Sequence, residues 1–224
     1  MTWFDSAWLG RMGGLLFRST LETLGMVLGS LIGGQILGLA LGITLILVRP
    51  GGLKENRTLH SVLNSAVNIG RSIPFVILMV TIMPFTRLLT GTAIGPIAAV
   101  VPLTVAAIPF VARLTETAML EVEAGVIEAC LSMGATWQQI VRYVLVPESL
   151  PSLIAGAATT AVNLVGYSTM AGAIGGGGLG DLAVRYGYQR WQTDVMLAAL
   201  VILVGMVQGM QFIGDRMSAK FRRR

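Results

Sequence analysis

The feature that most constrains the fold is a long uncharged run near the start of the chain. From Leu21 to Val48 the only charged residue is Glu22, at the outer end. Twenty-eight residues at about 1.5 Å each form a helix roughly 42 Å long, enough to cross a hydrocarbon core about 30 Å thick. The run therefore predicts a transmembrane helix.

The composition agrees with a membrane protein. Apolar residues make up 54% of the chain, charged residues 12%, and the mean hydropathy is +0.75. A soluble domain carries about 25% charged residues, and it would have nowhere to bury so much apolar surface. The single cysteine, Cys130, excludes an internal disulfide and is typical of a small core residue.

Further apolar runs predict an all-α, polytopic helix bundle that forms one transmembrane domain over residues 1–224. The expected spans are about 21–48, 62–89, 93–112, 150–170 and 195–212, with a cytoplasmic loop at 113–149. Pro74 and Pro84 interrupt the second span, for which a re-entrant segment is the alternative. An amphipathic interfacial helix is expected ahead of the first span, from the spacing of Phe4, Trp8, Met12 and Leu15.

Glycines recur inside the first span at four-residue spacing. The two series are Gly25, Gly29, Gly33 and Gly34, Gly38, Gly42. Such spacing flattens one helix face and lets a neighbouring backbone approach. The series predicts close helix packing and says nothing about a substrate.

Lysine and arginine predict the orientation. Eleven lie on one face, namely Arg49, Lys54, Arg57, Arg71, Arg113, Arg142, Arg216, Lys220, Arg222, Arg223 and Arg224. The other five are Arg11, Arg18, Arg87, Arg185 and Arg190. Because the richer face is cytoplasmic, the N-terminus is expected outside and the C-terminus inside.

The strong spans lack the groups that ion-driven transport or intramembrane catalysis needs. No Asp, Glu, Lys or His is expected well inside them. The chain has no G-x-x-x-x-G-K-[ST] loop, and its one histidine, His60, and one cysteine form no metal-binding pair. Energy for uphill transport would have to come from another chain, and the other class of protein left open is a passive channel or a structural membrane subunit.

Three glycines formally match the dinucleotide fingerprint G-x-G-x-x-G. They are Gly175, Gly177 and Gly180, between two predicted spans. The fingerprint has meaning only between a strand and a helix of a soluble βαβ unit. A flexible or closely packed turn is the expected structure.

The segment from Glu121 to Pro147 predicts a helix–turn–helix elbow. One helix is expected to end near Met133, with Gly134 as a left-handed cap, and the next to run to Val146 and stop before Pro147. Small residues along the first helix would let it enter a cleft on a partner. A solvated loop is the alternative.

The same segment resembles the signature of ABC importer permeases, which begins E-A-A-x₃-G-A and ends I-x-L-P. The matching residues are Glu128, Ala129, Gly134, Ala135 and Pro147; Cys130 replaces the second alanine, and Val144 and Val146 replace isoleucine and leucine. The stretches RSIPF at 71–75, VPLTVAAIPFVARL at 101–114 and LVGYSTMAGAIGGGGLGDLAVRYGYQR at 164–190 resemble the methionine-importer permeases of the MetI type. The resemblance covers nearly the whole chain.

The resemblance implies a type I ABC importer permease in the bacterial inner membrane. A second copy of this chain, two cytoplasmic ATPase subunits and a periplasmic or lipid-anchored substrate-binding protein would be its partners, with D- or L-methionine as substrate. ATP and Mg would be bound by the ATPases, with no cofactor or metal on this chain, no enzymatic activity of its own and no nucleic acid. The ATPase-coupling residues would be Glu128, Ala129, Cys130, Gly134, Ala135 and Pro147. A permease for another amino acid or an osmoprotectant is the nearest alternative.

A zwitterionic substrate with an apolar side chain favours small, neutral-polar and apolar lining residues. The candidates are Asn163, Tyr167, Ser168, Thr169 and Met170, with Pro74 and Pro109 as kinks at a gate. Helix–helix contacts and ordinary packing kinks are the alternatives.

Overall fold

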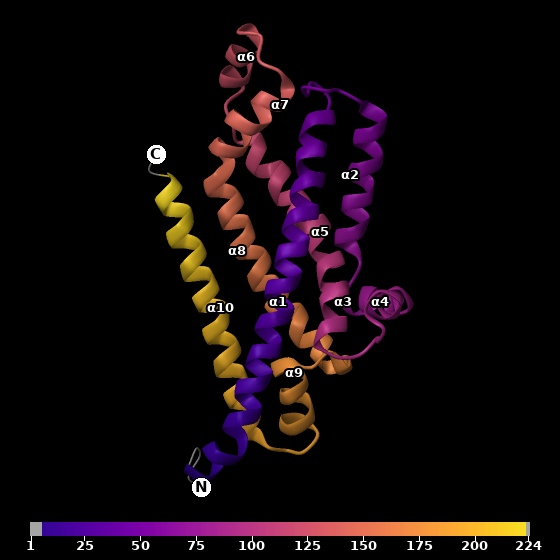
Figure 1. Ribbon diagram of the computed structural model, residues 1–224, viewed down its shortest axis with the longest axis vertical. Coiled ribbons are helices and arrows are strands. Elements are labelled where there is room, and N and C mark those ends of the chain that lie inside the picture. Colours follow the sequence, from indigo (N-terminus) through magenta and orange to yellow (C-terminus); the bar gives the residue numbers. More distant parts are fainter. Residues whose placement is uncertain (1–5, 223–224) are drawn as a thin grey trace. The chain divides into compact units, whose positions relative to one another are not determined.

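The computed structural model describes the backbone of residues 6–222 and the side chains of residue 10 and residues 12–222, and every regular element in this range is helical (Figure 1). In chain order the elements are α1 (Ser6–Val48), α2 (Arg57–Ser72), α3 (Phe75–Thr81), α4 (Met83–Thr90), α5 (Pro96–Leu120), α6 (Ala124–Ser132), α7 (Trp137–Ile140), η1 (Val141–Leu145), α8 (Val146–Ala171), η2 (Gly172–Gly176), α9 (Gly178–Leu182), η3 (Ala183–Tyr188) and α10 (Thr193–Arg222). The elements η1 and η3 are π-helical, whereas η2 contains a kink, where Ile174 and Gly175 have non-helical backbone angles. The predicted all-α fold is confirmed.

Contacts divide the described residues into two compact units. Unit 1 contains the residues up to Ile32 together with Pro74–Val105 and Ala161–Gln211. Unit 2 contains Gly33–Ile73, Ala106–Thr160 and the residues from Phe212 onward. The elbow lies in unit 2 and the glycine-rich turn in unit 1. A single domain over residues 1–224 stays a prediction.

Four helical stretches among residues 6–222 are long and apolar enough to span a membrane. They are Met12–Val48, Pro96–Leu120, Trp137–Gly176 and Thr193–Arg222, and α2 with α3 would be a fifth, broken span. The interfacial helix expected ahead of the first span is not separate, because α1 already begins at Ser6. Phe4, which belonged to that prediction, lies outside the described residues.

The predicted second span, 62–89, is not one helix. It contains the end of α2 and the short helices α3 and α4. Ile73 adopts an extended conformation (φ −77°, ψ 122°) between α2 and α3. A proline disfavours the α conformation in the residue before it, so Pro74 ends the helix at this point.

Unit 2 confirms the packing role of one glycine series. A methyl group added at Gly34 would lie 2.6 Å from the Cβ atom of Ala107. Methyl groups at Gly38 and Gly42 would each lie 2.5 Å from a Cβ atom, that of Val111 and that of Thr115, respectively. These glycines therefore let α1 approach α5 along two turns of helix. Of the other series, Gly25 has open space beside it, so spacing alone did not identify the packed face.

Unit 1 has its own apolar core, built from segments far apart in the sequence. Leu16 of α1 packs with Leu179 and Leu182 of α9 and with Val195 and Ala199 of α10. Burial of these side chains holds the short helix α9 in place.

Candidate functional site: the coupling elbow and the candidate pathway

The first elbow helix, α6, ends in the predicted left-handed glycine. Gly134 has φ +80°. Its N–H donates to the carbonyl of Leu131 at 2.9 Å, and the N–H of Ala135 donates to the carbonyl of Cys130 at 3.0 Å. This pair of bonds is a Schellman motif, which satisfies the last carbonyls of the helix and reverses the chain. Thr136 follows immediately and starts the next helix.

The second elbow helix begins with a capping box. Thr136 Oγ1 accepts the N–H of Gln139, whose side-chain oxygen accepts the N–H of Thr136 at 2.8 Å. Two N–H groups that a helix start leaves unpaired are thereby satisfied.

The expected stop before Pro147 is wrong. The chain is helical from Trp137 through α7, η1 and α8 to Ala171, and Pro147 is the second residue of α8. The N–H of Val146 donates to the carbonyl of Val141, five residues earlier, so the helix is already widened into a π turn where the proline enters. A proline is tolerated there because its missing N–H and bulky ring fall where the α-helical bonding pattern is interrupted.

A buried apolar cluster connects the elbow to the ends of two long helices in unit 2. Ile140 and Leu145 pack with Met119 of α5 and with Ile46 and Leu47 of α1. In addition, the Oγ of Ser152 donates to a carboxylate oxygen of Glu121 at 2.7 Å, and the ammonium of Lys54 lies 4.2 Å from the ring centroid of Trp137, which packs against the cluster. The elbow is therefore firmly attached to α1, α5 and α8.

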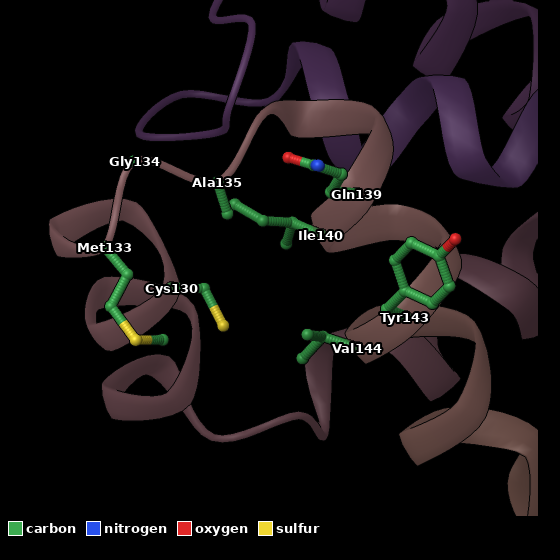
Figure 2. A pocket seen from close by; sticks show the side chains of 8 residues that line it. All are labelled: Cys130, Met133, Gly134, Ala135, Gln139, Ile140, Tyr143 and Val144. Atoms are coloured by element: carbon green, nitrogen blue, oxygen red, sulfur yellow. The ribbon is translucent and has the colours of Figure 1, made fainter.

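A cavity of about 370 Å³ lies between the two elbow helices (Figure 2). Its lining consists of Cys130, Met133, Gly134, Ala135, Gln139, Ile140, Tyr143 and Val144. Figure 2 shows Cys130 from α6 and Ile140 and Val144 from the second helix around the same space. Met133 and Tyr143 at its rim are 79% and 68% exposed. A mostly apolar hollow with an exposed apolar rim suits an apolar side chain of another protein.

The predicted coupling residues are divided between the outside and the inside of this elbow. Glu128, Ala129 and Pro147 are exposed, whereas Cys130 and Ala135 are half-buried and face the cavity. Glu128 also lines a second cavity of about 610 Å³ with Arg49, whose buried Nε atom has no hydrogen-bond partner among the described residues. The sequence offered no signal for this second cavity.

Six of the seven candidate pathway residues belong to unit 1. The Tyr167 ring stacks on Phe75, with centroids 4.8 Å apart and planes 5° from parallel. The hydroxyl of Ser168 donates to the carbonyl of Val165, and that of Thr169 donates to Gly166, both at 2.7 Å. Both hydroxyls therefore donate within their own helix, α8.

Three candidates leave their side chains accessible. Asn163 and Met170 are exposed on α8, and Gly166 between them is exposed too. Positions three and seven residues apart lie on one helix face. Pro74, also exposed, precedes α3 at the break described above.

Pro109 belongs to unit 2. It is buried, and a methyl group added at Gly70 of α2 would lie 3.1 Å from its ring. α5 runs unbroken through Pro109, so this proline is a packing surface for α2. Its role at a gate stays a prediction.

The sequence interpretation missed a buried polar network in unit 2. Glu116, with a side chain only 8% exposed, accepts a bond of 2.6 Å from Arg113, and His60 Nε2 lies 3.9 Å from its other oxygen. Arg113 also donates to the side-chain oxygens of Asn64 and Asn68 at 2.6 and 2.8 Å. α5 continues to Leu120, beyond the predicted end at residue 112, so a buried carboxylate does lie on a membrane helix. The signal was the spacing of residues 60, 64 and 68 on an amphipathic helix.

The glycine-rich turn is the closely packed structure expected, with no strand before it. η2 precedes α9, and Gly178 donates its N–H to Glu22 Oε2 at 3.0 Å. The N–H of Leu179 donates to Thr23 Oγ1 at 2.9 Å. Side chains of α1 thus already accept hydrogen bonds from the N–H groups that a dinucleotide phosphate would need.

Residues 25–224 match the family described as binding-protein-dependent transport system inner membrane component. The probable D-methionine transport system permease protein MetI of Vibrio cholerae is 50% identical over 208 residues, 93% of this chain and 92% of that protein. The D-methionine permease MetI of Escherichia coli K12 is 51% identical over 158 residues, covering 70% and 73%. The methionine import permease MetP of Bacillus subtilis is 47% identical over 200 residues, covering 89% and 90%.

Solved structures agree with the similarity to methionine permeases. A chain of the MetNI methionine ABC transporter, in inward-facing conformations, matches with a TM-score of 0.93 and 49% identity, covering 94% of this chain and 98% of that one. An amino acid ABC transporter matches with a TM-score of 0.74 at 18% identity, which shows a common fold alone.

Proposed function

Because this chain belongs to the family of binding-protein-dependent transport inner membrane components, we propose that it is the transmembrane subunit of an ATP-driven importer for D- or L-methionine. The observation that carries the proposal is the 50% identity to a methionine permease over nearly the full length of both chains. The importer would consist of two copies of this chain, two ATPase subunits that bind ATP and Mg, and a substrate-binding protein.

The elbow is the part that receives the ATPase. Its exposed face carries Glu128 and Ala129, and its cavity is open between the two elbow helices. An ATPase movement that pushes the elbow reaches α1 and α5 through the buried cluster around Ile140 and Met119. A packed core transmits displacement because it has few voids to absorb it.

The exposed face of α8 at Asn163, Gly166 and Met170 lines the substrate pathway. A neutral amide and a thioether side chain can contact a zwitterion with an apolar tail without placing a charge in the membrane. Tyr167, next to Gly166 on the same helix, stacks on Phe75 of α3 with the ring centroids 4.8 Å apart, which holds this part of α8 against α3.

The test is transport by a reconstituted importer. The permease and its ATPase would be reconstituted in proteoliposomes, with the methionine-binding protein in the same bath as the solute. ATP hydrolysis and solute uptake would then be measured with L-methionine, D-methionine, another amino acid and an osmoprotectant. We expect stimulation of hydrolysis and uptake with methionine. If only another solute were taken up, methionine would not be the substrate. Solute flux that does not depend on ATP would indicate a channel.

The proposed location is the inner membrane, with the N-terminus outside and the C-terminal arginines inside. The excess of Lys and Arg, eleven against five, supports this orientation. Reporter fusions at the two ends should report opposite sides. If both report one side, the number of spans is even, and the segment around Ile73 to Thr90 is re-entrant.

A further inference from the structure

The charged end of α10 follows directly after an apolar run of membrane length. From Val195 to Gly214 the chain carries no charged residue, and these 20 residues at about 1.5 Å each form a helix about 30 Å long. This length matches the thickness of the hydrocarbon core of a bilayer. Asp215, the first charged residue after the run, is therefore expected at the level where lipid headgroups begin.

The end of α10 touches α8 at two points in unit 2. A methyl group added at Gly214 would collide with the Cβ atom of Ala158, so the two helices are in close contact there. One turn further along α10, the hydroxyl of Ser218 donates to the carbonyl of Pro151 of α8 at 2.9 Å. These two contacts hold the end of α10 on α8.

A hollow of about 310 Å³ lies beside these contacts. Its lining consists of Ala155 of α8 and of Asp215, Ser218, Ala219 and Arg222 of α10. Asp215 and Arg222 are seven residues apart, which places them on one helix face with about 10 Å of helix between them. This separation is too long for an ion pair across a single helical turn, and the small alanines leave the space between the two charged side chains open.

The neighbouring charges leave Asp215 and Arg222 available. Within the part of the chain that the structure describes, neither has an ion-pair partner. The guanidinium of Arg216 lies 4.3 Å from the centroid of an aromatic ring of its own helix, and Lys220 is exposed; neither lines the hollow. The one charged residue of α8, Glu148, does not line it either. The hollow therefore offers one carboxylate and one guanidinium to a ligand.

Opposite charges in one hollow suit a lipid headgroup that carries both charges. A guanidinium donates strong hydrogen bonds to a phosphate, and a primary ammonium group has three N–H groups to donate to a carboxylate. A headgroup with only negative charge would be repelled by Asp215. Phe212 and Ile213, in the turn before Asp215, are 57% and 59% exposed, so acyl chains have an apolar surface beside the hollow.

We propose that this hollow binds the headgroup of phosphatidylethanolamine, with the ammonium group on Asp215 and the phosphate on Arg222. A choline headgroup has no N–H to donate, so the site distinguishes between these two zwitterionic lipids. The bound lipid contacts α8 and α10 together and supports their packing at the membrane surface. The proposal requires that α10 spans the membrane and does not depend on which solute is carried.

The test is lipid binding to the complete permease–ATPase complex in detergent, measured by native mass spectrometry. The probes are dilauroyl lipids with ethanolamine, choline and glycerol headgroups. We expect the ethanolamine lipid to bind at least about tenfold more tightly than the choline lipid, because a hydrogen bond to a charged group is lost in the latter. Asp215→Asn should make these two Kd values equal. Arg222→Gln should raise both about tenfold, whereas Lys220→Gln, which removes the same charge outside the hollow, should leave both unchanged.

A variant that fills the hollow tests its location. Ala219→Leu adds volume at an exposed helix position without changing the charge, and it should abolish the preference for the ethanolamine lipid. A preference that survives in Ala219→Leu or in Asp215→Asn would overturn the proposal. Equal wild-type Kd values for the ethanolamine and choline lipids would overturn it too, and this is the result expected if a second copy of the chain or the ATPase covers the hollow. Tightest binding of the glycerol lipid, unchanged in Arg222→Gln, would show that the basic end of the chain attracts anionic lipid without a site, and would also overturn the proposal.

Discussion

The elbow and the glycine-rich turn both reverse the chain with left-handed glycines, but they use glycine for different reasons. At the elbow, Gly134 has φ +80° and nothing within 4 Å of where a methyl group would lie. In the turn, Gly175, Gly177 and Gly178 also have positive φ, and Gly180 has backbone atoms packed against it. Glycine supplies conformation alone in the first region, and both conformation and space in the second.

This difference means that the two regions respond differently to added side chains. In the elbow a new Cβ atom meets solvent and only the backbone conformation is penalised. In the turn it meets backbone atoms of another segment, which cannot move without disturbing the packing of unit 1.

The largest expected effect is that of Gly180→Val. A Cβ atom there would lie 2.5 Å from both the Cα and the carbonyl oxygen of Thr169. We expect a loss of about 3 kcal/mol or more of folding free energy, seen as a lower thermal midpoint in detergent and less protein in the membrane. Gly166→Ala, on α8 with nothing within 4 Å, is the control and should keep the wild-type midpoint. A wild-type midpoint for Gly180→Val would show that the turn is not closely packed.

Glu22→Ala tests how the turn is held. The substitution removes the acceptor of the Gly178 N–H, and an unpaired, partly buried N–H costs about 1–3 kcal/mol. The thermal midpoint should fall, though less than for Gly180→Val. Arg18→Ala removes only the exposed ion-pair partner of Glu22, and such a pair contributes at most about 1 kcal/mol. Equal effects of the two substitutions would mean that Glu22 acts through Arg18 and not through the turn.

Gly134→Val probes conformation without crowding. A β-branched residue in the left-handed region costs about 1–2 kcal/mol, so the elbow should shift while the apolar helices stay folded. At matched membrane levels we expect weaker co-purification of the ATPase and reduced transport, with Gly134→Asn intermediate. Wild-type transport by Gly134→Val would remove the elbow from the coupling mechanism. A loss of stability as large as for Gly180→Val would erase the distinction between the two regions.

The smallest expected effect is a change in the labelling rate of Cys130, with no change in stability. Cys130 is half-buried beside the elbow cavity, and it is the only cysteine, so thiol labelling reports on this cavity alone. Labelling from the cytoplasmic side should be slower in the complex with the ATPase than in the isolated permease. Labelling of the unfolded chain gives the reference rate, and equal rates in the two native samples would contradict ATPase docking at the cavity.

Local features of the elbow were predictable. The left-handed Gly134 and the end of α6 follow from residues within one helical turn, and the structure agrees within one residue. Pro147 was misread because a proline ends a helix only where the α-helical bonding pattern is intact, and the π turn before it was invisible in the sequence. The roles of the coupling and pathway residues stay predictions.

Contacts between distant segments were not predictable. The bond between Glu22 and Gly178 joins residues 156 positions apart, and nothing near either residue indicates the other. Glu116 was missed because residues 113–149 were expected to form a cytoplasmic loop, whereas α5 continues to Leu120 and brings Glu116 beside His60 of α2. The hollow at the end of α10 likewise depends on a neighbour in space, Ala155 of α8.

The sequence by itself determined the class of this protein and its family. Long uncharged runs leave a chain no stable alternative to membrane helices, since every backbone polar group must be paired inside the helix. The tertiary structure alone decided which glycines are packed, which charges are buried and which aromatic residues are exposed. Each of these depends on the atoms that another segment brings within a few ångströms, and helical periodicity within one segment does not contain that information.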